Sequence, residues 1–136
     1  MLPLAALAAV FGLVPGAAVP ADGQICPLAG CESQVVVSLR SVPRVAQAPF
    51  GRVRVCAAGT CTVTPARSRG AHHPVPNVQG PQPVKVAVTF TTRSGTPLWR
   101  RTRAATLRRS QPNGPDCPPV CWTGRLVVRD GRLADG

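Results

Sequence analysis

Apolar and polar residues alternate along much of this chain with the two-residue period of a half-buried β-strand. Residues 33–40, Ser-Gln-Val-Val-Val-Ser-Leu-Arg, place Val35, Val37 and Leu39 on one face. The most regular pattern is that of residues 84–90, Val-Lys-Val-Ala-Val-Thr-Phe, whose valines and phenylalanine are expected to point inward. The same alternation predicts further strands at residues 52–55, 62–64, 98–99, 104–109 and 122–129.

These seven short strands, with turn residues between them and no helical pattern of useful length after residue 21, predict an all-β domain. We expect an immunoglobulin-like antiparallel β-sandwich, and a small barrel is the alternative. Aromatic residues make up only 4% of the chain, so the core of either fold must consist mainly of valine, leucine and alanine.

Two regions between the strands have distinctive turn patterns. Residues 56–61, Cys-Ala-Ala-Gly-Thr-Cys, predict a hairpin with a four-residue loop that brings its two cysteines face to face. Residues 65–83 contain five prolines and are expected to form a surface loop. His72 and His73 lie in that segment with no carboxylate near them in sequence, so we expect them to be solvated and predict no metal site.

The N-terminal segment has the composition of an export signal. Residues 2–19 are apolar and uncharged, and Val19-Pro20-Ala21 is a pattern that signal peptidase accepts. We expect residues 1–21 to be a cleaved signal peptide, with a retained N-terminal anchor as the alternative, and residues 22–136 to form a single domain. Leu28-Ala29-Gly30-Cys31 also matches a bacterial lipobox, which would make Cys31 a lipidated N-terminus.

Six cysteines after an apolar leader indicate an oxidising compartment and a disulfide-stapled domain. Cys117 and Cys121 lie in a proline-rich stretch, residues 111–122, whose expected extended geometry places them too far apart to bond each other. In many immunoglobulin-like sandwiches the first and last strands are parallel neighbours, which would bring these cysteines close to the two before the first strand. Of the fifteen pairings that six cysteines allow, we prefer Cys26–Cys117, Cys31–Cys121 and Cys56–Cys61, with the first two exchanged as the alternative.

The long bridges are expected to matter more than the local one. In the chain-entropy description, a closed loop of about 90 residues stabilises by roughly 4.6 kcal/mol and one of about six residues by roughly 2.2 kcal/mol. A core with few aromatic residues should depend most on the long bridges.

The net charge is +11, and the basic residues are fifteen arginines and Lys85. Such an excess is typical of a surface for polyanions. The codon bias of a GC-rich genome explains the arginines without a ligand, but it does not explain the scarcity of acids. The candidate anion-binding residues lie in an acid-free window with Trp99, whose indole is a candidate for stacking on a ligand ring; they are Arg93, Arg100, Arg101, Arg103, Arg108 and Arg109. From the sequence we favour the simpler interpretation that they form the solvated face of two strands.

The chain offers little for catalysis. Its only acids are Asp22, Glu32, Asp116, Asp130 and Asp135, mostly near turns or termini, and it has no tyrosine, no Cys-x-x-Cys motif and no phosphate-binding glycine loop. We therefore expect no enzymatic activity and no cofactor.

Three motifs together resemble those of small, Cys-rich secreted or envelope proteins of high-GC bacteria. They are Cys-Pro-Leu-Ala-Gly-Cys-Glu-Ser at 26–33, Val-Cys-Ala-Ala-Gly-Thr-Cys at 55–61 and Gln-Pro-Asn-Gly-Pro-Asp-Cys-Pro-Pro-Val-Cys-Trp at 111–122. The resemblance implies a location outside the cytoplasm and an immunoglobulin-like fold, and it carries no known activity.

Two functions are compatible with these features. The first, which we favour from the sequence, is a non-enzymatic structural or interaction module of the cell envelope with an envelope protein or polymer as its partner. The alternative is a binder of polyanions (acidic glycan, envelope polymer or nucleic acid) that uses the arginine-rich strands. In both cases we expect contact with a membrane only through the leader or a lipid anchor.

Overall fold

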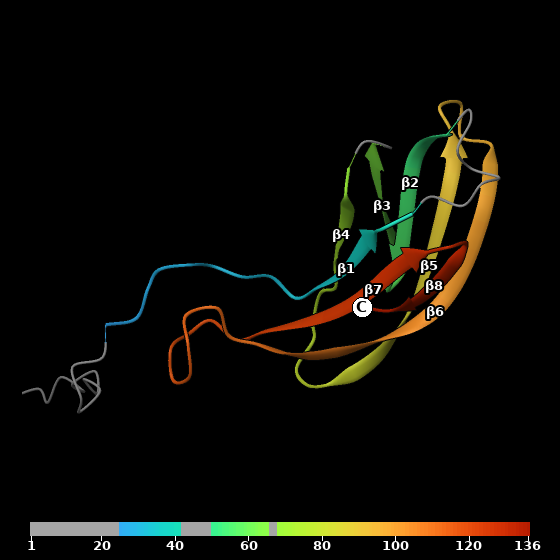
Figure 1. Ribbon diagram of the computed structural model, residues 1–136. Helices are drawn as coiled ribbons and strands as arrows, with labels where there is room; N and C mark the ends of the chain where they lie inside the picture. Colours follow the sequence, from blue (N-terminus) through green and yellow to red (C-terminus); the bar gives the residue numbers. More distant parts are fainter. Residues whose placement is uncertain (1–24, 42–49, 66–67) are drawn as a thin grey trace, which may run out of the picture.

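The computed structural model describes residues 25–41, 50–65 and 68–136, which form an all-β domain with three disulfides (Figure 1). The signal peptide predicted at residues 1–21 lies outside the described residues. Within the described ranges there is no helix able to cross a membrane. The strands are β1 (Gln34–Leu39), β2 (Phe50–Ala57), β3 (Thr60–Pro65), β4 (Gly70–Pro74), β5 (Gln82–Thr92), β6 (Pro97–Ser110), β7 (Cys121–Arg129) and β8 (Arg132–Asp135).

The strands form one continuous, mostly antiparallel sheet that rolls into a nearly closed barrel. Its order is β3-β2-β5-β6-β7-β1-β4, with β8 paired to β7. The one parallel pair joins β1 to β7, so the predicted neighbourhood of the first and last expected strands is confirmed. The all-β prediction is also confirmed, but the sheet is continuous because β6 takes part in both halves of it.

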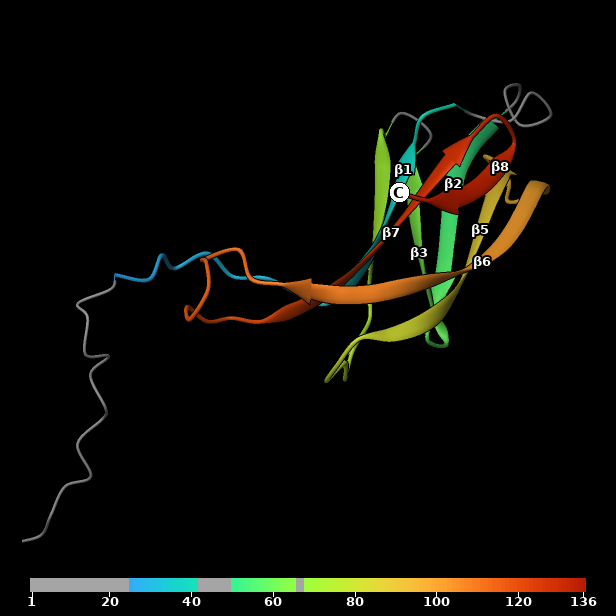
Figure 2. The ribbon, with the colours of Figure 1, turned by 60° about the horizontal axis from the view of Figure 1, so that its bottom comes forward.

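β6 joins the two halves by changing partners along its length. Residues 97–107 pair with β5, and residues 108–110 pair with β7. Two separate strands were predicted here, at 98–99 and 104–109; the structure has a single strand of 14 residues, because the charged residues between them continue the ladder to β5. Before residue 108, β6 and β7 diverge as a fork, and β8 lies between them (Figure 2).

A glycine allows β6 and β7 to approach each other where the fork begins. A Cβ atom at Gly124 would lie 2.9 Å from Cδ2 of Leu107 and 3.1 Å from Cβ of Ala105. The first of these distances is shorter than real carbon contacts, so a side chain at this position would force the buried side chain of Leu107 to move.

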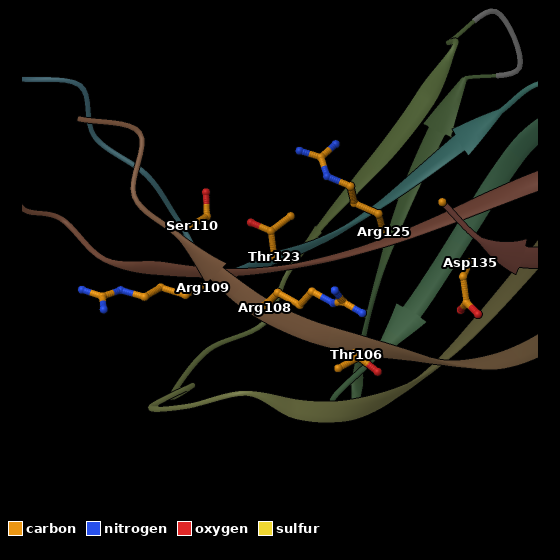
Figure 3. Close-up of a pocket in the computed structure, with 8 residues that line it drawn as sticks. Thr106, Arg108, Arg109, Ser110, Thr123, Arg125 and Asp135 are labelled. Carbon is orange, nitrogen blue, oxygen red and sulfur yellow. The ribbon is translucent and has the colours of Figure 1, made fainter. Parts of the chain in front are cut away.

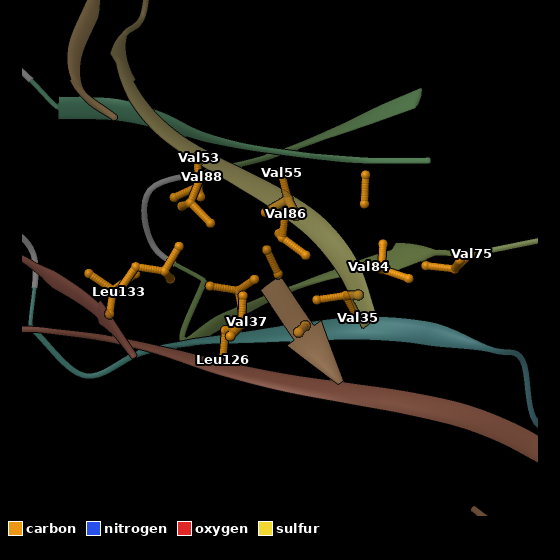
Figure 4. Packing of buried hydrophobic residues seen from close by; sticks show 14 of the residues in the cluster. Val35, Val37, Val53, Val55, Val75, Val84, Val86, Val88, Leu126 and Leu133 are labelled. Atoms are coloured by element: carbon orange, nitrogen blue, oxygen red, sulfur yellow. The ribbon is translucent and has the colours of Figure 1, made fainter. Parts of the chain in front are cut away.

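The barrel interior is filled mainly by valines from facing strands (Figure 4). The inward positions predicted for residues 84–90 are confirmed, as are Val35 and Val37, whereas Leu39 is only partly buried. Phe90 and Trp99 are the aromatic pair of this core, with ring centroids 4.9 Å apart. The fully or almost fully buried side chains include Val53, Val55, Val86, Val88, Leu107, Leu126 and Val128.

Two hairpins turn through only two residues each. Ala58 and Gly59 both have positive φ, 50° and 80°, so the predicted four-residue loop is wrong and β2 and β3 extend to the turn itself. Asp130 and Gly131, with φ of 50° and 72°, form the second such turn and lead into β8, which was not predicted. Two-residue turns with two positive φ values match the right-handed twist of the paired strands, so the strand pairing continues up to the turn.

The prediction of a surface loop over residues 65–83 is wrong in the middle of that segment. Residues 70–74 form β4, which pairs with β1, and Ala71, His73 and Val75 point inward. The strand is hard to detect in the sequence because one of its inward positions holds alanine and the next holds histidine. Neither residue strengthens the apolar alternation on which the prediction depends.

The buried side chain of His73 connects β4 to β3, the two edge strands of the sheet. Its Nδ1 lies 2.7 Å from Oγ1 of Thr62, and its Nε2 lies 3.1 Å from the carbonyl oxygen of Ala57 and 3.2 Å from Oγ1 of Thr60. Because a carbonyl only accepts, Nε2 donates to Ala57, and in the neutral imidazole Nδ1 then accepts from the hydroxyl of Thr62. The imidazole thus takes the place of a backbone ladder between these two strands.

Residues 25–33 and 111–120 form an extension that projects from one end of the barrel (Figures 1 and 2). The structure pairs its cysteines as preferred from the sequence, Cys26 with Cys117 and Cys31 with Cys121, and the hairpin carries Cys56–Cys61. In this structure the sulfur of Cys31 is bonded to that of Cys121, and the lipobox alternative stays a prediction.

The proline-rich side of this extension differs from the extended run that was expected. Residues 111–120 contain turns, and the peptide bond between Pro118 and Pro119 is cis. The side-chain amide of Asn113 donates to the carbonyl oxygens of Ala29 and Pro118, at 2.9 Å and 2.7 Å, and so ties the two segments together.

Candidate anion-binding site

The six arginines predicted to bind anions lie at several different places. Arg93 lies in the turn between β5 and β6, and the other five lie on β6. Since successive residues of a strand face opposite sides of the sheet, Arg100 and Arg108 share the outer face, and Arg101, Arg103 and Arg109 share the opposite face. The sequence cluster therefore does not form one patch.

Arg101 and Arg103 already have partners within the protein. The guanidinium carbon of Arg101 lies 5.3 Å from the ring centroid of Trp99. Trp99 is buried against Phe90 and covered by Arg101, so its ring is not open for the ligand stacking suggested by the sequence. Arg103 donates two hydrogen bonds to Asp135, from Nε at 3.0 Å and from Nη2 at 2.6 Å.

The Arg103–Asp135 pair joins β6 to β8 across the fork. The hydrogen bond from Arg103 lowers the pKa of Asp135; partial desolvation opposes this, and the charges of Arg103 and Arg108 lower the pKa further. Both side chains are largely exposed, at 43% and 72%, so solvent screens the pair and its contribution to stability is small.

We expect the contribution of this pair to disappear in acid. The pKa of Asp135 is lower in the folded than in the unfolded state, so the pair stabilises the fold above pH about 4 and ceases to do so as the pH falls through the folded-state pKa. In thermal unfolding between pH about 5 and about 2, the melting temperature of Asp135→Asn should fall less than that of the parent. Arg103→Gln should reduce the pH dependence of the melting temperature in the same way. If the melting temperatures of all three proteins fell in parallel with pH, the pair would not contribute to the acid sensitivity of the fold.

Arg108 lines a groove in the fork, where β6 leaves β7 (Figure 3). This fork groove has a volume of about 450 Å³. In Figure 3, Arg108 and Arg125 come from neighbouring strands, while Arg109 is directed away from Arg108. The groove is lined by the hydroxyl residues Thr106, Ser110 and Thr123, by the arginines Arg108, Arg109 and Arg125, and by Asp135 and Gly136.

Arg125 was not among the predicted residues. It lies in the last predicted strand, and it reaches the groove because the antiparallel register pairs Arg108 with Thr123, two residues before it. The signal that was available in the sequence is the pairing of the strands predicted at 104–109 and 122–129, which would have placed arginines from both beside each other.

Acidic side chains are distributed very unevenly around this site. The sequence contains no Asp or Glu between Glu32 and Asp116. Asp135 is the acidic side chain among the residues lining the fork groove, and it accepts both hydrogen bonds from Arg103. In the part of the chain that the structure describes, Arg103–Asp135 is the only salt bridge. The guanidinium groups of Arg108 and Arg125 therefore keep most of their positive potential.

The two histidines differ from each other. His72 is exposed, and its Nδ1 lies 3.2 Å from Oε1 of Gln34, in keeping with the predicted solvation; for the buried His73 that prediction is wrong. Over residues 25–41, 50–65 and 68–136, no group of three or more His, Cys, Asp or Glu side chains is placed to hold a metal ion.

The fork groove has the donors that an oxyanion requires. Guanidinium groups present paired N–H donors that match carboxylate, sulfate and phosphate oxygens, and hydroxyl groups can donate to the remaining oxygens. Comparisons with family models, with curated proteins and with solved structures find no match for this chain. Its function must therefore be inferred from its own residues.

Proposed function

We propose that this protein is a non-enzymatic secreted or cell-envelope module that binds an acidic polymer through the fork groove. The observation that carries the proposal is the placement of Arg108 and Arg125, on adjacent strands, around a groove that also holds three hydroxyl residues. A solvated strand face would need no such arrangement, so we now prefer polyanion binding to the simpler interpretation of these arginines.

The electrostatics of the groove favour an anion over a neutral group. Asp135 accepts both hydrogen bonds from Arg103, so an entering carboxylate or sulfate meets the lining arginines and one carboxylate that is already hydrogen-bonded. Arg108 and Arg125 are exposed to solvent, so each contact is screened and should be weak by itself. Useful affinity then requires a ligand with several charges, which is what a polymer provides.

The proposed location and fold class have separate support. Three disulfides are consistent with an oxidising compartment, and the apolar residues 2–19 fit an export signal. We also propose that the rolled sheet is a variant of the immunoglobulin-like sandwich, of the kind suggested by the resemblance to envelope proteins of high-GC bacteria. The parallel pairing of β1 with β7 supports this relation.

The test is a salt titration of binding to dextran sulfate and to polygalacturonate. Arg108→Gln combined with Arg125→Gln should weaken binding about tenfold or more, and the slope of log K against log salt should become shallower by about two, one for each lost ionic contact. The fold should be unaffected, because both side chains are exposed.

The matched control is Arg129→Gln combined with Arg132→Gln, two exposed arginines that face each other across the β7–β8 hairpin. This control removes the same charge away from the fork groove. Equal loss of affinity in both double variants would mean that only net charge matters, and the proposed site would be wrong.

A further inference from the structure

We propose that the ligand is an acidic polysaccharide that runs along the outer face of β6, from the fork groove to a second basic hollow on the β2–β5–β6 part of the sheet. This inference rests on the proposed function and adds a second contact region and a minimum ligand length. The observation that supports the inference is the order of the outward residues along β6.

The second hollow lies on the outer face beside the disulfide hairpin. It has a volume of about 480 Å³, and its lining includes the Cys56–Cys61 turn, Ala87, Thr102 and the two cations Lys85 and Arg100. We call it the outer hollow. Apart from the two cations, its lining consists of small residues, which leave room for a ligand to lie close to the backbone of the sheet.

More cations continue this face beyond the outer hollow. Arg54 pairs with Thr89 of β5, and Thr89 pairs with Arg100, so the two arginines lie in one row across three strands. Two strand spacings separate them by about 10 Å. Arg52 lies two residues from Arg54 on the same face, and no acidic residue occurs in any of these strands.

The outer hollow and the fork groove are neighbours along β6. The outer hollow is lined by Arg100 and Thr102, and the fork groove by Thr106 and Arg108. The outward residue between them is Ala104, which is small and exposed. Along the outward residues of β6, a ligand chain therefore meets cations at both ends, about 26 Å apart from Arg100 to Arg108, and no bulky or acidic residue of this strand between them. Asp135 of β8 borders the path at the fork groove, where it is hydrogen-bonded to Arg103.

The chemistry of this surface favours a polysaccharide over a nucleic acid. Single-stranded nucleic acids are normally held by aromatic side chains on which the bases stack. The outward residues of β6 from Arg100 to Arg108 are arginine, threonine and alanine, and Trp99 is buried under Arg101. Hydroxyl and guanidinium groups match the carboxylate or sulfate groups and the hydroxyls of an acidic sugar.

The test compares short and long fragments of the same acidic glycans. Heparin oligosaccharides provide sulfate and oligogalacturonates provide carboxylate, each fractionated into lengths below about 13 Å and above about 26 Å, corresponding to four and eight strand residues. The long fragments should bind about 100-fold more tightly, because the second contact is made at high effective concentration. Lys85→Gln combined with Arg100→Gln should remove most of this advantage and leave the groove affinity for short fragments unchanged.

A charge placed between the two regions gives an independent readout. Ala104→Glu should lower the affinity for long fragments and leave that of short fragments nearly unchanged, whereas the uncharged Ala104→Gln should change neither by more than about twofold. The Arg129→Gln and Arg132→Gln variant is again the control for net charge.

The outcomes separate this inference from the proposed function. If the affinity for short fragments depends on Arg108 and Arg125 but long fragments bind no more tightly, the fork groove is supported as a binding site and the extended path along β6 is wrong. If removal of Lys85 and Arg100 weakens short and long fragments equally, the extended path is also wrong. Tighter binding of single-stranded DNA than of a glycan of equal length would overturn the assignment to a polysaccharide.

Discussion

Replacing the four cysteines of the extension with alanine is expected to lower the free energy of unfolding by about 7 kcal/mol, which is comparable with the whole stability of a small domain. The two bridges, Cys26–Cys117 and Cys31–Cys121, span 91 and 90 residues and restrict nearly the whole described chain in its unfolded state.

The loops closed by the two bridges overlap along almost their whole length, and this changes what each bridge contributes alone. When one is present, the other closes only a ring of about ten residues, made of the short segments between the cysteines. Such a ring is worth roughly 2.7 kcal/mol in the chain-entropy description, against roughly 4.6 kcal/mol for a loop of about 90 residues. The gap that the sequence alone suggested between a long bridge and the hairpin bridge should therefore appear only when both long bridges are removed.

Urea unfolding of four variants tests this arrangement. Removing either long bridge, or the Cys56–Cys61 bridge, should cost about 2–3 kcal/mol in each case, and removing both long bridges should cost about 7 kcal/mol. The hairpin variant is the control for loss of a local bridge. If the variant without both long bridges were no less stable than the hairpin variant, the extension would not constrain the unfolded chain as proposed.

His73→Ala is expected to destabilise the domain by about 2–4 kcal/mol, because it removes a buried ring together with the bond between the two edge strands. The substitution leaves the carbonyl of Ala57 and the hydroxyl of Thr62 without their imidazole partner. Hydrogen exchange should accelerate first in β3 and β4, because without the imidazole these edges separate more easily.

The chain contains a closely matched control for this substitution. His72→Ala removes an exposed imidazole from the next residue, and it should change stability by less than about 0.5 kcal/mol. Thr62→Val, alone and combined with His73→Ala, isolates the Thr62–His73 hydrogen bond in a double-mutant cycle. Additive effects of the two substitutions would show that the imidazole only fills space and does not join the strands.

Much of the fold could be predicted because burial in a strand follows a local, two-residue period. Val35, Val37 and the valines of residues 84–90 are recognisable from their own neighbours, and the structure buries them as expected. The disulfide pairs could also be predicted from the sequence. A single assumption, that the first and last strands are parallel neighbours, brings the four distant cysteines to the same end.

Prediction from the local alternation of apolar and polar residues failed where a buried position holds a residue that is seldom buried, or where a strand is short. β4 was missed because His73 occupies an inward position, and its burial is compensated by partners on β3 that no local pattern reveals. β8 was missed although Asp130-Gly131 is a strong hairpin signal, because only four residues follow in the strand.

By itself, the sequence determined the strand faces, the disulfide-stapled character and the excess of positive charge, all of which depend on composition or on near neighbours. Only the tertiary structure decided which arginines lie together. In the folded protein Arg103 is paired with Asp135, and Arg101 covers Trp99. Arg125 lies beside Arg108 in the lining of the fork groove. These outcomes depend on the register between strands distant in sequence and on the point where β6 changes partners. No local pattern encodes either of them.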